Sequence, residues 1–357
     1  MASKLRVAVL FGGQSTEHDV SILSARNVIK AIDLAKYEIM PILIDRAGQW
    51  LLIELVDGAL PDRVAYAGTR ICLLPGGRGR LLAFGGPAGV TELPAIDILF
   101  PILHGMHGED GSVQGLAQIA GVPLVGCGIL GSAIAIDKDV AKRLLREAGL
   151  PVARSITIRS GESPIFEDVT NILGSPIFVK PARQGSSVGV SKARTAGEFH
   201  LALAEAFKFD TKVLVEEFVQ AREIECAVLE KADGAIVVSV PGEIVTAEAH
   251  GFYTYEAKYL DEKGATIDIP AQLPEQTARH LQDMARQAFI ALDCDALARV
   301  DFFVRPDMST VINEVNTMPG FTDISMYPKA MATSGTSYPE LIDSLIEHGL
   351  ARAQQAI

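Results

Sequence analysis

Short apolar runs alternate with stretches of helical periodicity along the first third of the chain. The runs VAVLF, EIMPILI, AIDILFPIL and VPLVG have the composition of buried strands, and residues 21–32, between the first two, show helical periodicity. This alternation is typical of a parallel sheet with covering helices. We therefore predict a doubly wound α/β domain over residues 1–130.

The rest of the chain divides into two further predicted units. Residues 137–150, DKDVAKRLLREAGL, predict a helix that a C-terminal glycine and a following proline end. The segment SPIFVKPARQGSSVGVSKA predicts two β-rich runs around a Gly/Ser turn, and KVLVEEFV predicts another strand. From about residue 220 the pattern indicates mostly β-hairpins, followed by a helical tail from Tyr338. We place a central unit at residues 131–218 and a C-terminal unit at residues 219–357.

Length, charge and cysteine spacing argue against several classes of protein. The 357 residues exceed one typical domain, and the formal net charge of -12 argues against a protein that wraps nucleic acid. Cys72, Cys127, Cys226 and Cys294 show neither metal-ligand spacing nor a dense disulfide pattern. The longest weakly polar stretch, residues 125–136, is shorter than a membrane span. We expect a cytoplasmic protein that binds neither nucleic acid nor a membrane.

The strongest group of polar residues lies in the segment ALARVDFFVRPDMSTVINEVNTMPG. If residues 306–309 form a four-residue hairpin loop, the strand register follows from counting back along both strands. The predicted pairs are Arg305 with Thr310, Asp301 with Glu314, and Arg299 with Asn316. Because strand side chains alternate between faces, the last two pairs place four polar side chains on one face.

Two facing carboxylates in this hairpin need a positive charge or a proton between them. Mg²⁺ meets that need, since it prefers carboxylate and amide oxygens and keeps positions for water and phosphate. A solvated face balanced by Arg299 is the alternative. The oxygen ligand on Asn316 and the apolar flanks favour the metal, so we predict a Mg²⁺ site formed by Asp301, Glu314 and Asn316.

A Gly/Ser turn in KPARQGSSVGVSK indicates phosphate binding. Lys180 ends an apolar strand and supplies a point charge, and the small residues that follow let N–H groups approach a phosphate. An ordinary turn between strands is the alternative. The P-loop pattern does not occur in the chain.

Polar, glycine-opened turns follow two of the predicted strands of the first domain. FGGQSTEHDVS leads into a helix near Glu17, and LFPILHGMHGEDGSVQG follows a strand that ends at His104. Ligands bind at such strand ends in doubly wound sheets. Capped helices and a histidine with a structural hydrogen bond are the alternatives. A third segment, FYTYEAKYL, is either a strand or a mobile loop that excludes water from a reactive intermediate.

In their order and combination these segments resemble the D-alanine:D-alanine ligases of the ATP-grasp superfamily, over essentially the whole chain. The resemblance implies a three-domain architecture, with ATP between the central and C-terminal units and amino acids against the N-terminal unit. It further implies ATP-dependent joining of two D-alanine molecules through D-alanyl phosphate, with release of ADP and phosphate, for peptidoglycan synthesis. ATP, two Mg²⁺ ions (or Mn²⁺), a monovalent cation and a homodimer belong to the same expectation.

The resemblance assigns roles to residues of the nucleotide site. Lys138 and Lys180 correspond to the lysines on the α- and β-phosphates, Ser187 to the loop that closes over them, Glu216, Glu217 and Val219 to the adenine hinge, Glu223 to the ribose carboxylate, and Lys258 to the lysine near the transferred phosphate. Asp301, Glu314 and Asn316 fall on the Mg²⁺ ligands. Glu217 stands where a lysine is frequent in the family.

The resemblance also assigns residues of the amino-acid sites. Glu17, hydrogen-bonded to Ser186 and Tyr259, corresponds to the residue that binds the ammonium group of the first D-alanine. The resemblance places His104 near the carboxyl group of the first substrate, and Ser325 and Met326 near the carboxylate of the second. It places Arg299 and the Gly320 N–H at the oxyanion. Met326 replaces a common leucine. Family members that make the D-lactate ester lack the tyrosine at position 259, so its presence favours an amine as second substrate. The alternatives are another ATP-grasp carboxylate-amine ligase, a D-alanyl-D-lactate or D-serine ligase, and a nucleotide-binding regulator.

Overall fold

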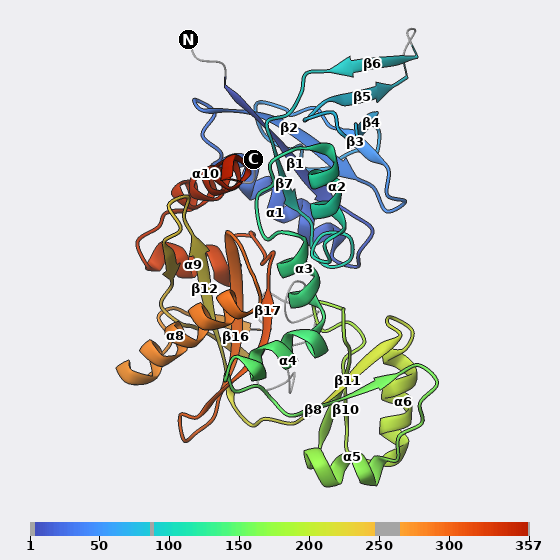
Figure 1. Cartoon of the computed structure of the whole chain (residues 1–357), viewed down its shortest axis with the longest axis vertical. Coiled ribbons are helices and arrows are strands. Elements are labelled where there is room, and N and C mark those ends of the chain that lie inside the picture. The colour runs from blue at the N-terminus through green and yellow to red at the C-terminus, as the bar shows by residue number, and fades with distance from the viewer. Residues whose placement is uncertain (1–3, 86–88, 247–264, 356–357) are drawn as a thin grey trace.

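The computed structural model describes residues 4–85, 89–246 and 265–355. Within these ranges three sheets follow one another along the chain (Figure 1). In Figure 1 the first sheet lies at the top, the second at the lower right and the third at the left, with α3 (Ile129–Ile136) and α4 (Lys138–Glu147) between them. Among the residues so described, no helix combines the length and the apolar character that a membrane crossing requires.

The first sheet has the strand order β6-β5-β4-β3-β2-β1-β7. Its elements are β1 (Leu5–Gly12), α1 (His18–Ala31), β2 (Tyr37–Ile44), β3 (Trp50–Leu52), β4 (Thr69–Leu73), β5 (Leu81–Phe84), β6 (Val90–Leu93), β7 (Ile98–Ile102) and α2 (Ser112–Ala120). β1 pairs in parallel with β2 and β7, whereas β3 to β6 extend the sheet in antiparallel order. The α/β class is confirmed, with the parallel part limited to three strands.

The prediction of a strand at VPLVG in this domain is wrong. It forms only an isolated parallel bridge between Leu124 and Leu99 of β7. Pro123 lacks the N–H that a longer ladder would need, and Gly126, with φ +102°, turns the chain immediately afterwards.

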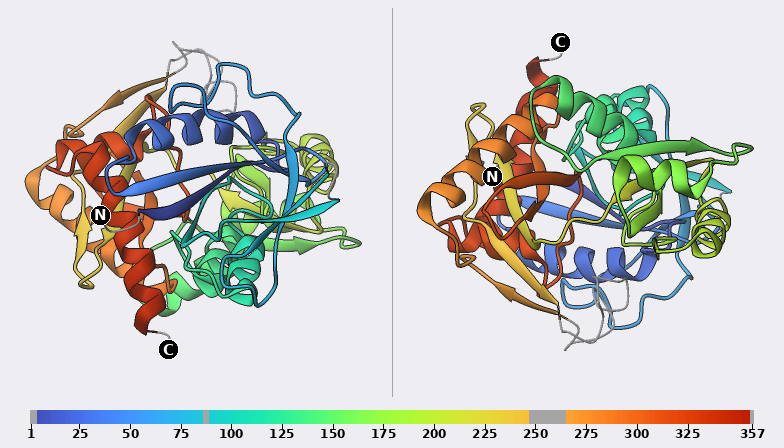
Figure 2. Two further views of the ribbon diagram at one scale, coloured as in Figure 1. Left: turned by 90° about the horizontal axis from the view of Figure 1, so that it is seen from above. Right: turned by 90° about the horizontal axis from the view of Figure 1, so that it is seen from below.

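Alternate side chains of β1 face opposite helical layers. Val7 and Val9 belong to the core that includes α1, whereas Ala8 and Leu10 belong to the core that includes α2. The C-terminal helix α10 (Tyr338–Gln355) returns to the first sheet and packs beside α1 and β7. Figure 2 shows this helix lying near the N-terminal strand in the view from above.

The second sheet is antiparallel, with the order β10-β9-β11-β8. Its elements are β8 (Ser155–Arg159), α5 (Phe166–Leu173), β9 (Ile177–Pro181), β10 (Ser191–Ala193), α6 (Ala196–Ala206) and β11 (Lys212–Glu217). The predicted strands around the Gly/Ser turn are β9 and β10. The predicted helix before them is α4, and the carboxylate of its N-cap residue Asp137 accepts a hydrogen bond from the Val140 N–H at 3.2 Å.

The third sheet has the order β15-β14-β12-β16-β17, with β13 also paired to β12. Its elements are β12 (Arg222–Glu230), β13 (Ile236–Val238), β14 (Gly242–Thr246), β15 (Ala265–Asp268), α8 (Glu275–Ala291), β16 (Leu297–Val304), β17 (Thr310–Asn316) and α9 (Met326–Thr333). The helical tail from Tyr338 is confirmed as α10. The prediction of mostly β-hairpins was wrong for residues 275–291, where buried side chains recur at helical spacing and pack α8 against β12 and β16. The division at residues 130 and 218 stays a prediction.

Candidate active site

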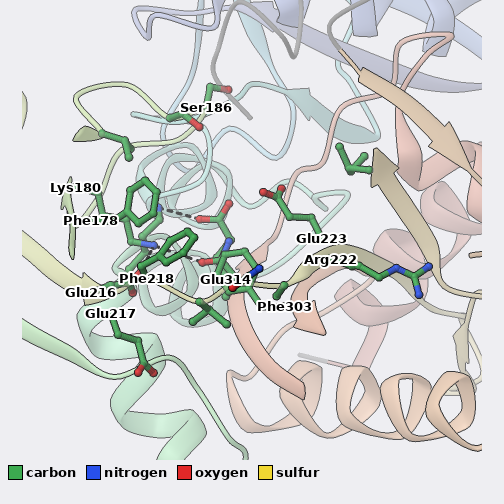
Figure 3. A pocket seen from close by; sticks show the side chains of 18 of the residues that line it. Phe178, Lys180, Ser186, Glu216, Glu217, Phe218, Arg222, Glu223, Phe303 and Glu314 are labelled. Atoms are coloured by element: carbon green, nitrogen blue, oxygen red, sulfur yellow. Dashed lines mark hydrogen bonds and ion pairs between the residues drawn. The ribbon is translucent and has the colours of Figure 1, made fainter. Parts of the chain in front are cut away.

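A cleft of about 430 Å³ lies between the second and third sheets (Figure 3). Sites for small molecules typically measure about 300–1,000 Å³, so a nucleotide-sized ligand is within its range. β9, β11, β12 and β14 all contribute lining residues. The residues that line the cleft and were predicted for the active site are Lys138, Lys180, Ser186, Ser187, Glu216, Glu217, Val219, Glu223 and Glu314.

Two lysines bind one buried carboxylate at the β11 wall of this cleft. Glu216 Oε2 lies 2.6 Å from Lys180 Nζ, and Glu216 Oε1 lies 2.9 Å from Lys142 Nζ. Burial alone would raise the pKa of the Glu216 carboxyl, but the two lysines outweigh burial and hold that pKa below its usual value. Sequence reasoning missed Lys142, although its position one turn after Lys138 on α4 was a signal.

The turn that follows β9 has a backbone suited to anions. Ser186 and Ser187 have φ values of +50° and +59°, in the left-handed region that few non-glycine residues adopt. Turns of this kind present backbone N–H groups to an anion. The Ser186 hydroxyl donates to the Glu17 carboxylate, which belongs to the N-terminal domain. A Cβ on Gly185 would lie 2.8 Å from Glu17 Oε2, so this close approach requires glycine.

Aromatic side chains form an apolar part of the same cleft. Phe178, Phe218 and Phe303 line it, and Lys192 Nζ lies 4.0 Å from the Phe218 ring centroid. Sequence reasoning missed these rings, although Phe178 stands two positions before Lys180 and so shares its face of β9. Figure 3 shows the Glu217 side chain directed away from this group.

The side chain of Glu217 is bound by Arg154, which immediately precedes β8. The Arg154 backbone N–H donates to Glu217 Oε1 at 2.8 Å, and Arg154 Nε donates to Oε2 at 2.7 Å. A ligand in the cleft can therefore meet main-chain groups near Glu217 and Val219 more readily than this carboxylate. Glu223 lines the opposite wall, on β12.

The predicted metal residues share one face of the β16–β17 hairpin. Asp301 pairs with Glu314 and Arg299 pairs with Asn316, as expected. The predicted pairing at the loop was wrong, because Thr310 pairs with Val304 rather than with Arg305. The loop is one residue longer than predicted, and a β-bulge after Asp301 restores the register. These two shifts of one residue cancel, so Asp301 and Arg299 still pair with Glu314 and Asn316.

Cations neutralise both facing carboxylates. Asp301 accepts two hydrogen bonds of 2.7 Å from Arg299 and one of 3.0 Å from Asn316 Nδ2, and Glu314 lies 3.3 Å from Lys138 Nζ. Arg299 Nε is also 3.0 Å from Glu225 of β12, a neighbour that sequence reasoning missed. In the described part of the chain, no three His, Cys, Asp or Glu side chains are grouped as a metal would need. The candidate ligand set is therefore two carboxylates and one amide.

Comparison with known proteins decides the family. Residues 6–127 match the family described as "D-ala D-ala ligase N-terminus", and residues 144–347 match "D-ala D-ala ligase C-terminus". The relative named D-alanine--D-alanine ligase A from Brucella suis is 57% identical over 353 residues, which cover 99% of both chains. This chain belongs to the D-alanine:D-alanine ligase family.

Solved structures of other family members share this fold. The D-alanine-D-alanine ligase from Coxiella burnetii has a TM-score of 0.86 at 36% identity, covering 99% of this chain and 96% of that one. The VanG D-Ala:D-Ser ligase from Enterococcus faecalis has a TM-score of 0.84 at 35% identity, covering 97% and 100%. The D-alanine--D-alanine ligase from Bacillus anthracis, solved in complex with ATP, has a TM-score of 0.74 at 26% identity, covering 99% and 100%. The ATP-grasp architecture is thereby confirmed.

In this member of the ligase family, His104 joins the first domain to the segment after β17. His104 Nδ1 lies 3.0 Å from the Met318 carbonyl oxygen, and Nε2 lies 3.2 Å from Ser24 Oγ. Burial lowers the pKa of the His104 imidazole and favours its neutral form. A neutral ring that donates from Nδ1 accepts at Nε2, so both nitrogens are used inside the protein. This arrangement agrees with the alternative given above, in which His104 forms structural hydrogen bonds.

Other predicted residues of the amino-acid sites lie near the start of α9. A Cβ on Gly320 would lie 2.7 Å from Ser325 Oγ, which itself accepts from the Thr322 N–H at 2.9 Å. Met326 is 3% exposed and belongs to the hydrophobic core, so its side chain is not presented to a ligand. Lys258 and Tyr259 lie outside the described residues.

Proposed function

We propose that this protein joins two molecules of D-alanine in an ATP-dependent reaction that supplies peptidoglycan synthesis. One observation carries the proposal: a chain similar to D-alanine:D-alanine ligases over its full length brings lysines, a Gly/Ser turn and an acidic hairpin together in one cleft. We therefore assign the phosphate donor and the residues that neutralise its charge to this cleft.

We assign the triphosphate of ATP to the side of the cleft that carries positive charge. Lys138 and Lys180 line it, as do residues 185–187, whose backbone N–H groups we assign to the phosphates. Phe178 and Phe218 supply an apolar surface for a purine ring, and Glu216 accepts hydrogen bonds only, as an exocyclic amine requires. Glu223 on the opposite wall suits ribose hydroxyls.

The donor set on the β16–β17 hairpin fits Mg²⁺. Asp301, Glu314 and Asn316 offer hard oxygen atoms on one face, and Glu314 itself lines the cleft. When bound, Mg²⁺ reduces the charge repulsion between a carboxylate nucleophile and the phosphates. We extend the proposal to two ions, to Mn²⁺ as a substitute and to a monovalent activator on family resemblance.

The chemistry proceeds in two steps. The first D-alanine carboxylate attacks the γ-phosphate, giving D-alanyl phosphate and ADP. The neutral amine of the second D-alanine then attacks that acyl carbon, and phosphate leaves. We assign Glu17 to the first ammonium, and Arg299 with the Gly320 N–H to the oxyanion. Glu17, held by Ser186, places the first substrate where the N-terminal domain meets the nucleotide cleft.

Family resemblance also supports three proposals about the whole protein: a homodimer, a location in the cytoplasm and a division into units 1–130, 131–218 and 219–357. Sedimentation of the purified chain measures the first of these directly. A monomer at all concentrations would contradict it.

Product analysis tests the function. The purified chain, with ATP and Mg²⁺, is given D-alanine alone, D-alanine with D-serine, D-alanine with D-lactate, or L-alanine, and ADP release and products are measured by chromatography. We expect stoichiometric D-alanyl-D-alanine and ADP with D-alanine, and neither with L-alanine. ADP release without D-alanine would contradict the proposal, and a mixed product in preference to D-alanyl-D-alanine would favour a D-serine or D-lactate ligase.

A further inference from the structure

Lys142 lies behind the wall of the proposed nucleotide site. Its Nζ lies 2.9 Å from Glu216 Oε1, and its side chain is 2% exposed. Lys142 does not line the cleft, whereas Glu216 and Lys180 do. Lys142 therefore contacts the wall of the cleft through the Glu216 carboxylate.

The two lysines bound to Glu216 differ in what they can reach. Lys180 lines the cleft, and its Nζ also lies 3.5 Å from Asn313 Oδ1, so an anion that enters the cleft can draw it away from Glu216. The Lys142 side chain is 2% exposed and does not line the cleft, so a ligand there offers its ammonium no alternative partner to Glu216. A buried carboxylate that lost both cations would take up a proton.

We propose that Lys142 is a positioning residue that keeps the Glu216 carboxylate ionised and in place while Lys180 turns to the phosphates of the nucleotide. This inference rests on the proposed function. An ionised carboxylate only accepts hydrogen bonds, whereas a protonated one can also donate. Lys142 thereby favours a purine with an amine at position 6 over one with an oxygen there, because the oxygen needs a donor.

The test measures binding rather than turnover. The full chain with Mg²⁺ is titrated calorimetrically with non-hydrolysable triphosphate analogues of adenosine and of inosine. Lys142→Met should weaken binding of the adenosine analogue about tenfold and reduce its preference over the inosine analogue by a similar factor. Lys142→Arg, which keeps the charge, should retain most of that preference. Arg143→Met is the matched control, because Arg143 is the next residue on α4 and its side chain is 62% exposed.

The loss of preference should be larger at pH 6 than at pH 8. Among the described residues, Glu216 of β11 is paired with Lys142 of α4 and Lys180 of β9, and Glu314 of β17 faces Lys142. Lys138 lies beside Glu314. In Lys142→Met the Glu216 carboxyl loses one of the two cations that lower its pKa, so acid protonates it more readily. Wild type should show no comparable change in preference.

A double variant keeps the inference testable if Lys142→Met alone fails to fold. Lys142→Met with Glu216→Gln leaves no buried carboxylate that lacks a cation, and in the Glu216→Gln background the added Lys142 change should alter affinity less than about twofold. A tenfold loss in that background, or an unchanged purine preference in Lys142→Met, would overturn the inference. A wild type that binds the adenosine analogue but forms no dipeptide would contradict the proposed function alone. A wild type that binds neither analogue would overturn both.

Discussion

Glu109 shows how one side chain acquires properties that its type alone does not give. Its carboxylate accepts from the Gly105 N–H at 2.6 Å and from the Met318 N–H at 3.1 Å, so it joins the loop after β7 to the segment after β17. Burial, with the charge of Glu17, raises the pKa of Glu109 to about 8, against those two hydrogen bonds and Lys138. Sequence reasoning selected His104 from the same loop and missed Glu109.

The raised pKa of Glu109 makes the free energy of unfolding depend on pH. Between its usual value of 4.5 and about 8 the folded state holds a proton that the unfolded state releases, so this group's contribution to stability falls as pH rises. Glu109→Gln removes that dependence. In urea unfolding, wild type should lose about 1 to 3 kcal/mol relative to the variant between pH 5.5 and pH 8.

Glu147→Gln is the control for this pH effect, since Glu147 is an exposed carboxyl at the end of α4. Its unfolding curve should follow that of wild type at both pH values. Parallel pH dependences for wild type and Glu109→Gln would show that the buried carboxyl does not hold the extra proton.

At the scale of elements, the β16–β17 hairpin arranges the candidate metal ligands. Alternation fixes which side chains share a face, and the bulge after Asp301 restores the register that the longer loop shifts. The turn also carries an acidic residue, Asp307, whose carboxylate accepts from the Ser309 N–H at 3.0 Å and lies away from the cleft. The same hairpin therefore contains the three candidate metal ligands and, in Asp307, a carboxylate that can serve as a control.

Asp301→Asn and Glu314→Gln should each reduce turnover about a hundredfold while the melting temperature stays close to that of wild type. Each change removes a negative oxygen from the proposed Mg²⁺ site without a large change in volume. ADP release at increasing Mg²⁺ concentration measures the effect, with Asp307→Asn as the matched control. Near-normal release with an unchanged Mg²⁺ requirement would refute this assignment.

At the scale of the whole molecule, the two ends of the chain form one core. Leu341 and Leu345 of α10 are fully buried in the cluster that contains Val7 and Val9 of β1. The same cluster continues into the third sheet through Ala227 of β12. The core beneath the N-terminal sheet therefore includes the helix α10, which is distant along the chain.

Leu345→Ala should lower the free energy of unfolding by about 2 to 5 kcal/mol, because it leaves a cavity in this shared core. Hydrogen exchange should then speed up in β1 and β7, more than 200 residues away along the chain. Glu347→Ala is the control, as its side chain is 56% exposed on the same helix. Faster exchange confined to α10 would show that the first sheet is stable without it.

The local elements and the residue types of the candidate site could be predicted from the sequence. Apolar periodicity and end signals predicted β1, α1, α4 and α10, and the polar residues of the hairpin predicted which side chains share a face. These properties are local, because they depend on the spacing of residues a few positions apart. The helix α8 also follows from a local pattern, because its apolar residues recur at helical spacing. It could therefore have been predicted from the sequence, but it was missed.

The contacts between distant residues could not be predicted in this way, because they depend on how the elements pack. Glu17 meets Ser186 across 169 positions, Lys142 lies behind Glu216, and Glu109 is sealed between two segments. Burial and the distance between charges set pKa values and ion pairing, and both depend on how separate elements pack. A sequence pattern records which face of an element is apolar, but it does not record what that face will meet.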